Sequence, residues 1–95
     1  MPSECEHNAH MYYVLLPDTD ARTRVLAGMK SAGVNAIFHY VPLHDSPAGK
    51  RFGRACGELD NTVNLSQRIV RLPLWVGLDE SAIEKVIDAL TGCLK

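Results

Sequence analysis

The segment that most constrains the fold is the apolar stretch MYYVLL, residues 11–16, which Pro17 closes. Its aromatic and β-branched side chains predict a strand. Successive side chains of a strand point to opposite faces, and here both faces are apolar. One carries Tyr12, Val14 and Leu16, and the other carries Met11, Tyr13 and Leu15. Such a sheet expects cover on both sides, either from helices of this chain or from a second layer that the chain does not contain.

The next elements follow from spacing and capping signals. Asp18 or Thr19 can cap a helix that ends at Gly33. Its apolar stripe consists of Ala21, Val25, Met29 and Ala32, flanked by Leu26. A second strand is predicted over residues 34–40, because the run is apolar and stops before Pro42.

The second half of the chain is richer in helices. Ser46 followed by Pro47 predicts a helix over 47–56, with Gly57 at its exit. A further helix is predicted over 62–71, and LPLW, residues 72–75, is interpreted as an edge strand that tolerates Pro73. Asp79 caps a last helix. The apolar stripe of that helix consists of Ile83, Val86, Ile87, Leu90 and Leu94. The order β-α-β-α-α-β-α in 95 residues predicts one domain, 1–95, of two-layer α+β class.

Composition excludes several classes of function. Ten basic and eleven acidic residues give a net charge of −1, which supplies no electrostatic attraction to nucleic acid or to an anionic membrane. No segment approaches the ~20 apolar residues of a membrane-spanning helix, and the start MPSECEHNAH has no apolar signal core. Three cysteines without a C-x-x-C pair favour reduced thiols in a cytoplasmic protein.

Two clusters of polar residues are candidate sites, and each has a simpler explanation. Cys5, His7 and His10 are ligand types that zinc accepts, but no second pair follows at a finger-like spacing, so a polar lead-in to the first strand is favoured. Lys50, Arg51 and Arg54 lie near the helix start at Ser46 and suit a phosphate. Three cations on a short helix are more often a solvated face.

The stretch IFHYVPLH, residues 37–44, places His39 and His44 on either side of Pro42. Side chains at a strand end often face clefts, and imidazole can donate or accept a hydrogen bond near neutral pH. A histidine bonded to a backbone carbonyl would explain the same pattern, and these eight residues alone favour that explanation.

The chain has no catalytic motif of its own. It lacks a nucleophile elbow, a P-loop, a dinucleotide glycine pattern and a zinc-protease helix motif. Its lysines lie among polar neighbours at positions 30, 50, 85 and 95, without the desolvated setting that activates an amine. We therefore assign no catalytic residue, and the chain resembles an incomplete enzyme.

Four blocks carry a family resemblance in register: HNAHMYYVLL (7–16), AIFHYVPLHDSPAG (36–49), RFG (51–53) and RLPLW (71–75). They resemble the C-terminal part of the DegT/DnrJ/StrS sugar aminotransferases, and most closely the transaminases that form dTDP-4-amino-4,6-dideoxygalactose for surface polysaccharides such as lipopolysaccharide. The likeness covers nearly the whole chain, from about His7 to Leu94.

This resemblance implies the small C-terminal domain of an aspartate-aminotransferase-fold enzyme, with a short, mainly antiparallel sheet covered by helices. In such enzymes a large domain carries pyridoxal phosphate (PLP) on a Schiff-base lysine, and the small domain closes over the site at a dimer interface. That lysine has no counterpart here, so the implied PLP belongs to the large domain and none is expected on this chain alone.

The resemblance also implies which residues meet the nucleotide sugar. The family's strand-end histidine falls on His39, Tyr40 is its neighbour in the motif, and His44 is a weaker match because many relatives differ there. The expected partners are the nucleotide sugar, the large domain and a second subunit.

The expected function is transfer of an amino group, from glutamate or another amino acid, to a dTDP-4-keto-6-deoxy sugar by the complete enzyme, with this chain inactive alone. Two alternatives stay open: a standalone module that binds a nucleotide sugar or pairs with a separate large domain, and a small metal-binding protein that uses Cys5, His7, His10 and His44.

Overall fold

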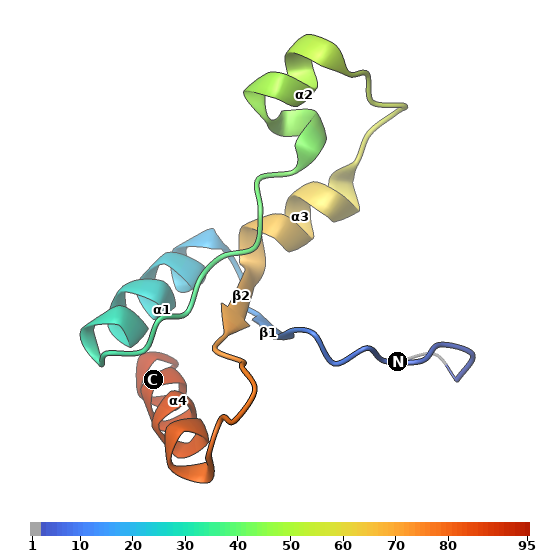
Figure 1. Cartoon of the computed structure of the whole chain (residues 1–95). Helices are drawn as coiled ribbons and strands as arrows, with labels where there is room; N and C mark the ends of the chain where they lie inside the picture. Colours follow the sequence, from blue (N-terminus) through green and yellow to red (C-terminus); the bar gives the residue numbers. More distant parts are fainter. Residues whose placement is uncertain (1–2) are drawn as a thin grey trace.

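A computed structural model describes residues 3–95. Its elements are β1 (Tyr12–Leu15), α1 (Thr19–Ser31), a 3₁₀ turn η1 (Leu43–Asp45), α2 (Pro47–Phe52), α3 (Asp60–Arg68), β2 (Ile69–Leu72) and α4 (Glu80–Cys93). The two strands pair antiparallel, with Tyr12 opposite Leu72 and Leu15 opposite Ile69. Figure 1 shows α1 and α4 beside this short sheet, and the α+β class is thereby confirmed.

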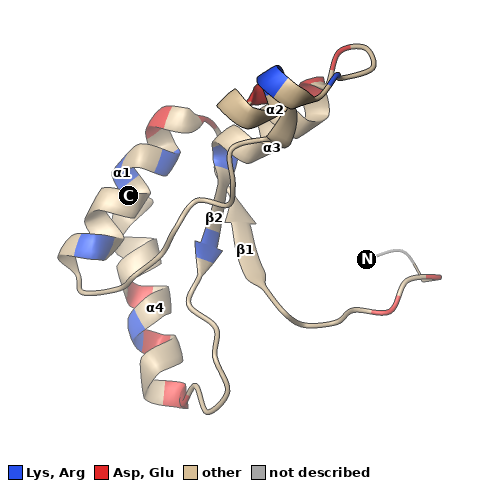
Figure 2. Ribbon diagram, turned by 45° about the horizontal axis from the view of Figure 1, so that its top comes forward, with Lys and Arg blue, Asp and Glu red and all other residues tan. Residues whose placement is uncertain are grey.

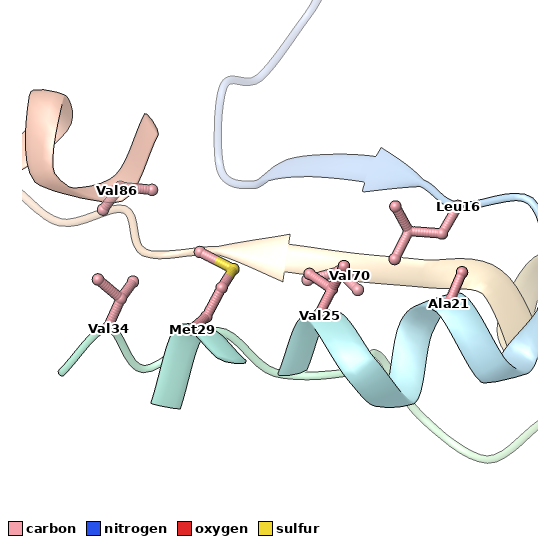
Figure 3. Close-up of a cluster of buried hydrophobic side chains, with 7 residues drawn as sticks. All are labelled: Leu16, Ala21, Val25, Met29, Val34, Val70 and Val86. Carbon is pink, nitrogen blue, oxygen red and sulfur yellow. The ribbon is translucent and has the colours of Figure 1, made fainter. Parts of the chain in front are cut away.

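The core lies between the sheet and these two helices (Figure 3). Within residues 3–95, the buried apolar side chains are Leu16, Ala21, Val25, Met29, Val34, Val70 and Val86. Three members of the stripe predicted on α1 are therefore buried as expected. The fourth, Ala32, is exposed because it follows the last helical residue, where its N–H bonds back to Gly28.

The other face of the sheet is open within the described part of the chain. Val14 packs against the core, whereas Tyr13 and Leu15 on the opposite face are 49% and 44% exposed. On the core face, Tyr12 at the start of the strand is 64% exposed, so the helices cover that face only from Val14 onward. Of the two arrangements that the sequence left open, the described residues therefore cover one face only. The apolar side chains of Tyr13 and Leu15 are therefore partly exposed on the second face.

The predicted strand over residues 34–40 does not form, and this expectation was wrong. Only Ile37 pairs with the sheet, through two hydrogen bonds to Arg71 of 3.2 and 2.7 Å. Continued antiparallel pairing would set residue 35 opposite Pro73, which has no N–H to donate. The third strand is therefore reduced to a single bridge beside β2.

The third strand predicted, residues 72–75, was placed too late in the chain. β2 covers Ile69–Leu72 and stops before Pro73, and α3 ends at Arg68 instead of residue 71. The β-branched pair Ile69 and Val70 favours extended backbone, and Val70 is fully buried. β2 is also central, with β1 on one side and Ile37 on the other.

Residues 43–59, which comprise η1, α2 and the loop to α3, project from the rest as an arm (Figure 1). The cap at Ser46 is as predicted, since its Oγ accepts from the Gly49 N–H at 2.9 Å. The helix ends at Phe52 instead of residue 56, and none of residues 43–59 is buried. This projection, together with the extended segment that precedes β1 (Figure 1), accounts for a radius of gyration of 15.7 Å, against about 13 Å for a compact chain of this size.

The last helix forms where predicted, with Asp79 Oδ1 accepting from the Ala82 N–H at 2.8 Å. Its apolar stripe is only partly covered: Val86 is buried, whereas Ile87 and Leu94 are more than half exposed. Ile83 and Ile87 line an open apolar groove of about 320 Å³ together with Tyr12.

Charges are mixed over the surface. Figure 2 shows positions of basic and of acidic residues along both α1 and α4, in keeping with the balanced composition. Among residues 3–95, no helix has the length and apolarity needed to cross a membrane.

Candidate functional site

The segment after Ile37 leaves the sheet and carries the first two predicted site residues. His39 is half-buried and Tyr40 is 69% exposed. Their rings meet edge to face, with centroids 4.7 Å apart and an interplanar angle of 62°. The backbone bridge at Ile37 holds the start of this segment, so the fold brings His39 and Tyr40 together where the chain leaves the sheet.

The His39 ring has one nitrogen that is closed off from solvent. Nδ1 is buried and has no hydrogen-bond partner among residues 3–95. Leaving an N–H unpaired in such a place costs about 1–3 kcal/mol. An unpaired buried lone pair is costly as well, so Nδ1 lacks a needed partner in either tautomer. With the proton on Nε2, His39 offers a hydrogen-bond donor through that nitrogen.

Tyr40 borders a small hollow of about 200 Å³ between α1, α3 and the segment after the bridge. The side chain of Arg22 also borders it, and Nη1 of Arg22 donates to the Ser66 carbonyl at 2.9 Å. The Arg22 guanidinium carbon lies 5.8 Å from the centroid of the Phe38 ring. Sequence patterns alone do not point to Arg22, because its backbone partner is 44 positions away.

The third predicted residue, His44, lies apart from the other two. It belongs to η1 and borders a larger open hollow of about 960 Å³ within the arm, together with Phe52 and Arg54. Tyr40 and His44 therefore border two different hollows, and His39 lines neither of them. Contact of all three with one ligand remains a prediction.

The three cations of the arm have mostly local partners. Lys50 Nζ forms an ion pair with Asp45 at 2.6 Å, and the Arg51 guanidinium carbon lies 4.9 Å from the centre of the Phe52 ring. The hydrogen bond and charge of Lys50 hold the pKa of the Asp45 carboxyl below its ordinary value. Only Arg54 has neither kind of partner within residues 3–95, an arrangement typical of a solvated face.

The N-terminal metal candidates do not converge. His7 Nδ1 accepts from the Ala9 N–H at 2.7 Å, and His10 Nδ1 lies 2.6 Å from Asn8 Oδ1. Across residues 3–95, no group of three potential ligand side chains could hold a metal ion. Cys5 is exposed and free, so these residues give the metal-binding alternative no support.

The lysines do not fit the attachment of PLP. All four lysines are exposed, and Lys50 is held in its ion pair with Asp45. A Schiff-base lysine needs an enclosed setting that favours its neutral amine. The residues described here therefore do not form a PLP site by themselves, and we derive no reaction step through the cofactor on this chain.

Comparison with known proteins relates the chain to a family of aminotransferases. The sequence profile of the DegT/DnrJ/EryC1/StrS aminotransferase family matches residues 1–91. The spore coat polysaccharide biosynthesis protein SpsC of Bacillus subtilis (strain 168) is 24% identical over an alignment 94 positions long, which covers 94% of this chain and 24% of SpsC.

Two solved structures are similar over almost the full chain. The aminotransferase TlmJ from Streptoalloteichus hindustanus matches 99% of it with a TM-score of 0.83 and 26% identity. A DegT DnrJ EryC1 StrS aminotransferase from Brucella abortus matches 97% with a TM-score of 0.77 and 26% identity. In both cases the chain spans 24% of the length of the solved protein.

Proposed function

Because the chain belongs to the DegT/DnrJ/EryC1/StrS aminotransferase family, we propose that it is the small C-terminal domain of a PLP-dependent sugar aminotransferase. The observation that carries this proposal is the match of 99% of the chain to one quarter of a solved aminotransferase. The family's cofactor and its lysine would come from a large domain outside these 95 residues.

The proposed reaction of the complete enzyme moves an amino group from glutamate, or another amino acid, to the 4-keto carbon of a dTDP-linked 6-deoxy sugar. Its product would serve lipopolysaccharide or another surface polysaccharide, and the enzyme would work in the cytoplasm. PLP supplies the electron sink for such chemistry when it is bound. The contribution of this chain is to orient the sugar and to exclude water.

The open sheet face supports the proposed partner. The side chains of Tyr13, Leu15 and Ile37 are each between 44% and 49% exposed. Large apolar side chains of this kind are usually buried when a second layer packs on the sheet. Exposed apolar surface of this kind is typical of an interface. We propose that the large domain, or a second subunit, covers this face.

His39 is the residue that we propose contacts the nucleotide sugar. Its ring is oriented against Tyr40, its Nδ1 has no partner among residues 3–95, and the tautomer protonated at Nε2 presents that N–H as a donor. A donor suits a sugar or cofactor oxygen, whereas proton transfer in this fold belongs to the lysine of the large domain. Tyr40 and His44 complete the proposed contact set.

The decisive experiment replaces His39 in the complete enzyme. His39→Ala removes the donor and is expected to lower kcat/KM by about two- to tenfold for a contact to a neutral oxygen, and by more for a charged one. A neutral hydrogen bond contributes roughly 0.5–1.5 kcal/mol and one to a charged group roughly 1.5–3 kcal/mol. His39→Gln keeps an N–H near the Nε2 position and should recover part of the loss. Exposed His10→Ala is the matched control and should leave kcat/KM unchanged.

Unchanged kinetics in His39→Ala would remove the assignment. A companion measurement uses this chain alone, with a dTDP-4-keto-6-deoxy sugar added during an amide NMR titration. Shifts confined to residues 39–44 would mean that the chain binds part of the substrate by itself, as the standalone-module alternative also requires. A dispersed spectrum that does not respond to the sugar would exclude a standalone sugar-binding module and leave only pairing with a separate large domain.

A further inference from the structure

The side chain of Arg22 holds a polar atom that the protein leaves without a partner. Its Nη1 donates to the Ser66 carbonyl at 2.9 Å, but its Nε is buried and has no acceptor among residues 3–95. An unpaired buried donor on a charged group is costly. An acceptor from outside the described residues would remove this cost.

The hollow beside Arg22 has room for such an acceptor. Its volume is about 200 Å³, and its walls include Tyr40 and Gln67, which both carry hydrogen-bonding side chains. Since Nη1 is engaged with Ser66, the free edge of the guanidinium is the one formed by Nε and Nη2. Two N–H groups along one edge match the two oxygens of a carboxylate or phosphate.

We propose that this hollow binds an oxyanion, carboxylate or phosphate, through the Nε edge of Arg22. Because Nε is closed off from solvent, the anion requires a neighbouring side chain to move. Phe38, 47% exposed with its ring centroid 5.8 Å from the guanidinium carbon, is the side chain that we expect to shift. The oxyanion site is inferred from this geometry alone. Two ligands could supply the oxyanion, the carboxylate of the amino donor or the diphosphate of the nucleotide sugar, and this identification rests on the proposed function.

One acidic residue, Asp45, also borders the hollow. Its charge predicts in which direction its removal should change the affinity for an anion. Asp45 lies on the wall, and its charge is partly offset by the ion pair with Lys50 at 2.6 Å. An anion in the hollow is repelled by the Asp45 carboxylate. Asp45→Asn should therefore tighten anion binding, and it also frees the Lys50 ammonium.

The first test observes the Nε–H of Arg22 by ¹⁵N NMR of the whole chain, in buffer free of phosphate and sulfate. Burial slows exchange of this proton with water, which makes its signal observable. Inorganic pyrophosphate and glutamate are added in separate titrations. We expect one of them to shift the Arg22 Nε–H signal saturably, together with the backbone amide signals of Tyr40 and Gln67. A response to pyrophosphate would indicate the diphosphate of the nucleotide sugar, and a response to glutamate would indicate the carboxylate of the amino donor. No shift with either probe overturns the proposal and leaves an ordered water as the partner.

Variants then distinguish binding through the paired N–H donors of Arg22 from attraction to positive charge alone. Arg22→Lys keeps the charge but loses the paired donors, and should weaken binding of the active probe about tenfold. Arg24→Lys, on the exposed face of the same helix, is the matched control and should leave binding unchanged. Equal weakening in both variants, or weaker binding in Asp45→Asn, overturns the proposal.

The anion test does not depend on one variant, and its outcome is independent of the His39 kinetics. Arg22→Lys also disturbs the contact to Ser66, so if this variant unfolds, the Nε–H titration of the unaltered chain and the Asp45→Asn variant decide. Failure of anion binding leaves the His39 kinetics untouched. Loss of the proposed function, in turn, would appear as unchanged kcat/KM in His39→Ala while the Arg22 signal still responds.

Discussion

The body of the molecule, formed by β1, α1, β2 and α4, differs sharply from the arm of residues 43–59. Within the described chain, the buried side chains lie in the body or directly beside its elements, as Leu16 and Val34 do, and the arm has none. In the arm, Leu43 and Phe52 are 78% and 79% exposed. Folding of the body is therefore driven by apolar burial, whereas the arm is shaped by local capping and is available to contact something else.

The difference in helix length has the same consequence. α1 and α4 contain 13 and 14 residues and pack on the sheet or on each other, while α2 contains six. A helix of two turns without tertiary packing is marginal in water. The arm is therefore the part whose structure a partner would stabilise, and the body is the part that should fold unaided.

The strongest test of this comparison removes one large side chain from each region. Met29→Ala in the body should lower the free energy of unfolding by about 2–5 kcal/mol, because Met29 is fully buried and its loss leaves a cavity. Phe52→Ala in the arm should change it by less than about 0.5 kcal/mol. Urea denaturation measures both, and equal losses would mean that the arm belongs to the core.

The contact between α1 and α4 gives a sharper test within the body. A Cβ on Gly28 would overlap the Cys93 sulfur, so Gly28→Ala should destabilise the chain by about 1–3 kcal/mol. With Cys93→Ala already in place, the same substitution should stabilise by up to about 1 kcal/mol, since alanine favours the helix. The same sign in both backgrounds, measured by urea denaturation, would show that the two helices are not packed this closely.

The smallest expected effect concerns acid. The Ala82 N–H and the Ser81 hydroxyl hold the pKa of Asp79 below its ordinary value. A lowered folded-state pKa adds stability above the ordinary value of about 3.9, and this stability is lost as the pH falls further. Asp79→Asn should therefore flatten the pH dependence of unfolding below about pH 4.

Asp45, whose pKa is also lowered, is the control from the arm. Asp45→Asn should leave the pH dependence of global unfolding unchanged, because the arm contributes no buried side chain. A matching change in both variants would contradict the separation of body and arm.

Local signals predicted β1 and the starts of the capped helices, but they misplaced the ends of α2 and α3 and the other two strands. Asp18, Ser46 and Asp79 each cap a helix within three residues, and each does so in the structure. Strand positions depend on which distant segment supplies the hydrogen bonds. Pro73 and the short β2 left residues 34–40 with a single bridge, which an apolar pattern cannot indicate.

In the candidate site too, some features follow from the order of residues in the chain and others only from the fold. The adjacency of His39 and Tyr40 follows from their order in the chain, and the structure adds the edge-to-face contact and the unpaired Nδ1. His44 is close in sequence, yet the 3₁₀ turn carries it to a different hollow. Arg22 is remote in sequence and meets the hollow beside Tyr40 only through packing of α1 on α3.

The sequence by itself determined the family, the class of fold, the starts of the capped helices and the buried stripe of α1. These depend on residues a few positions apart, whose hydrogen bonds and spacing are local. Only the tertiary structure decided that one sheet face is open, that the arm lacks a core and that Arg22 keeps an unpaired donor. Those features arise where segments dozens of residues apart meet, and no local pattern encodes which atoms are then left without a partner.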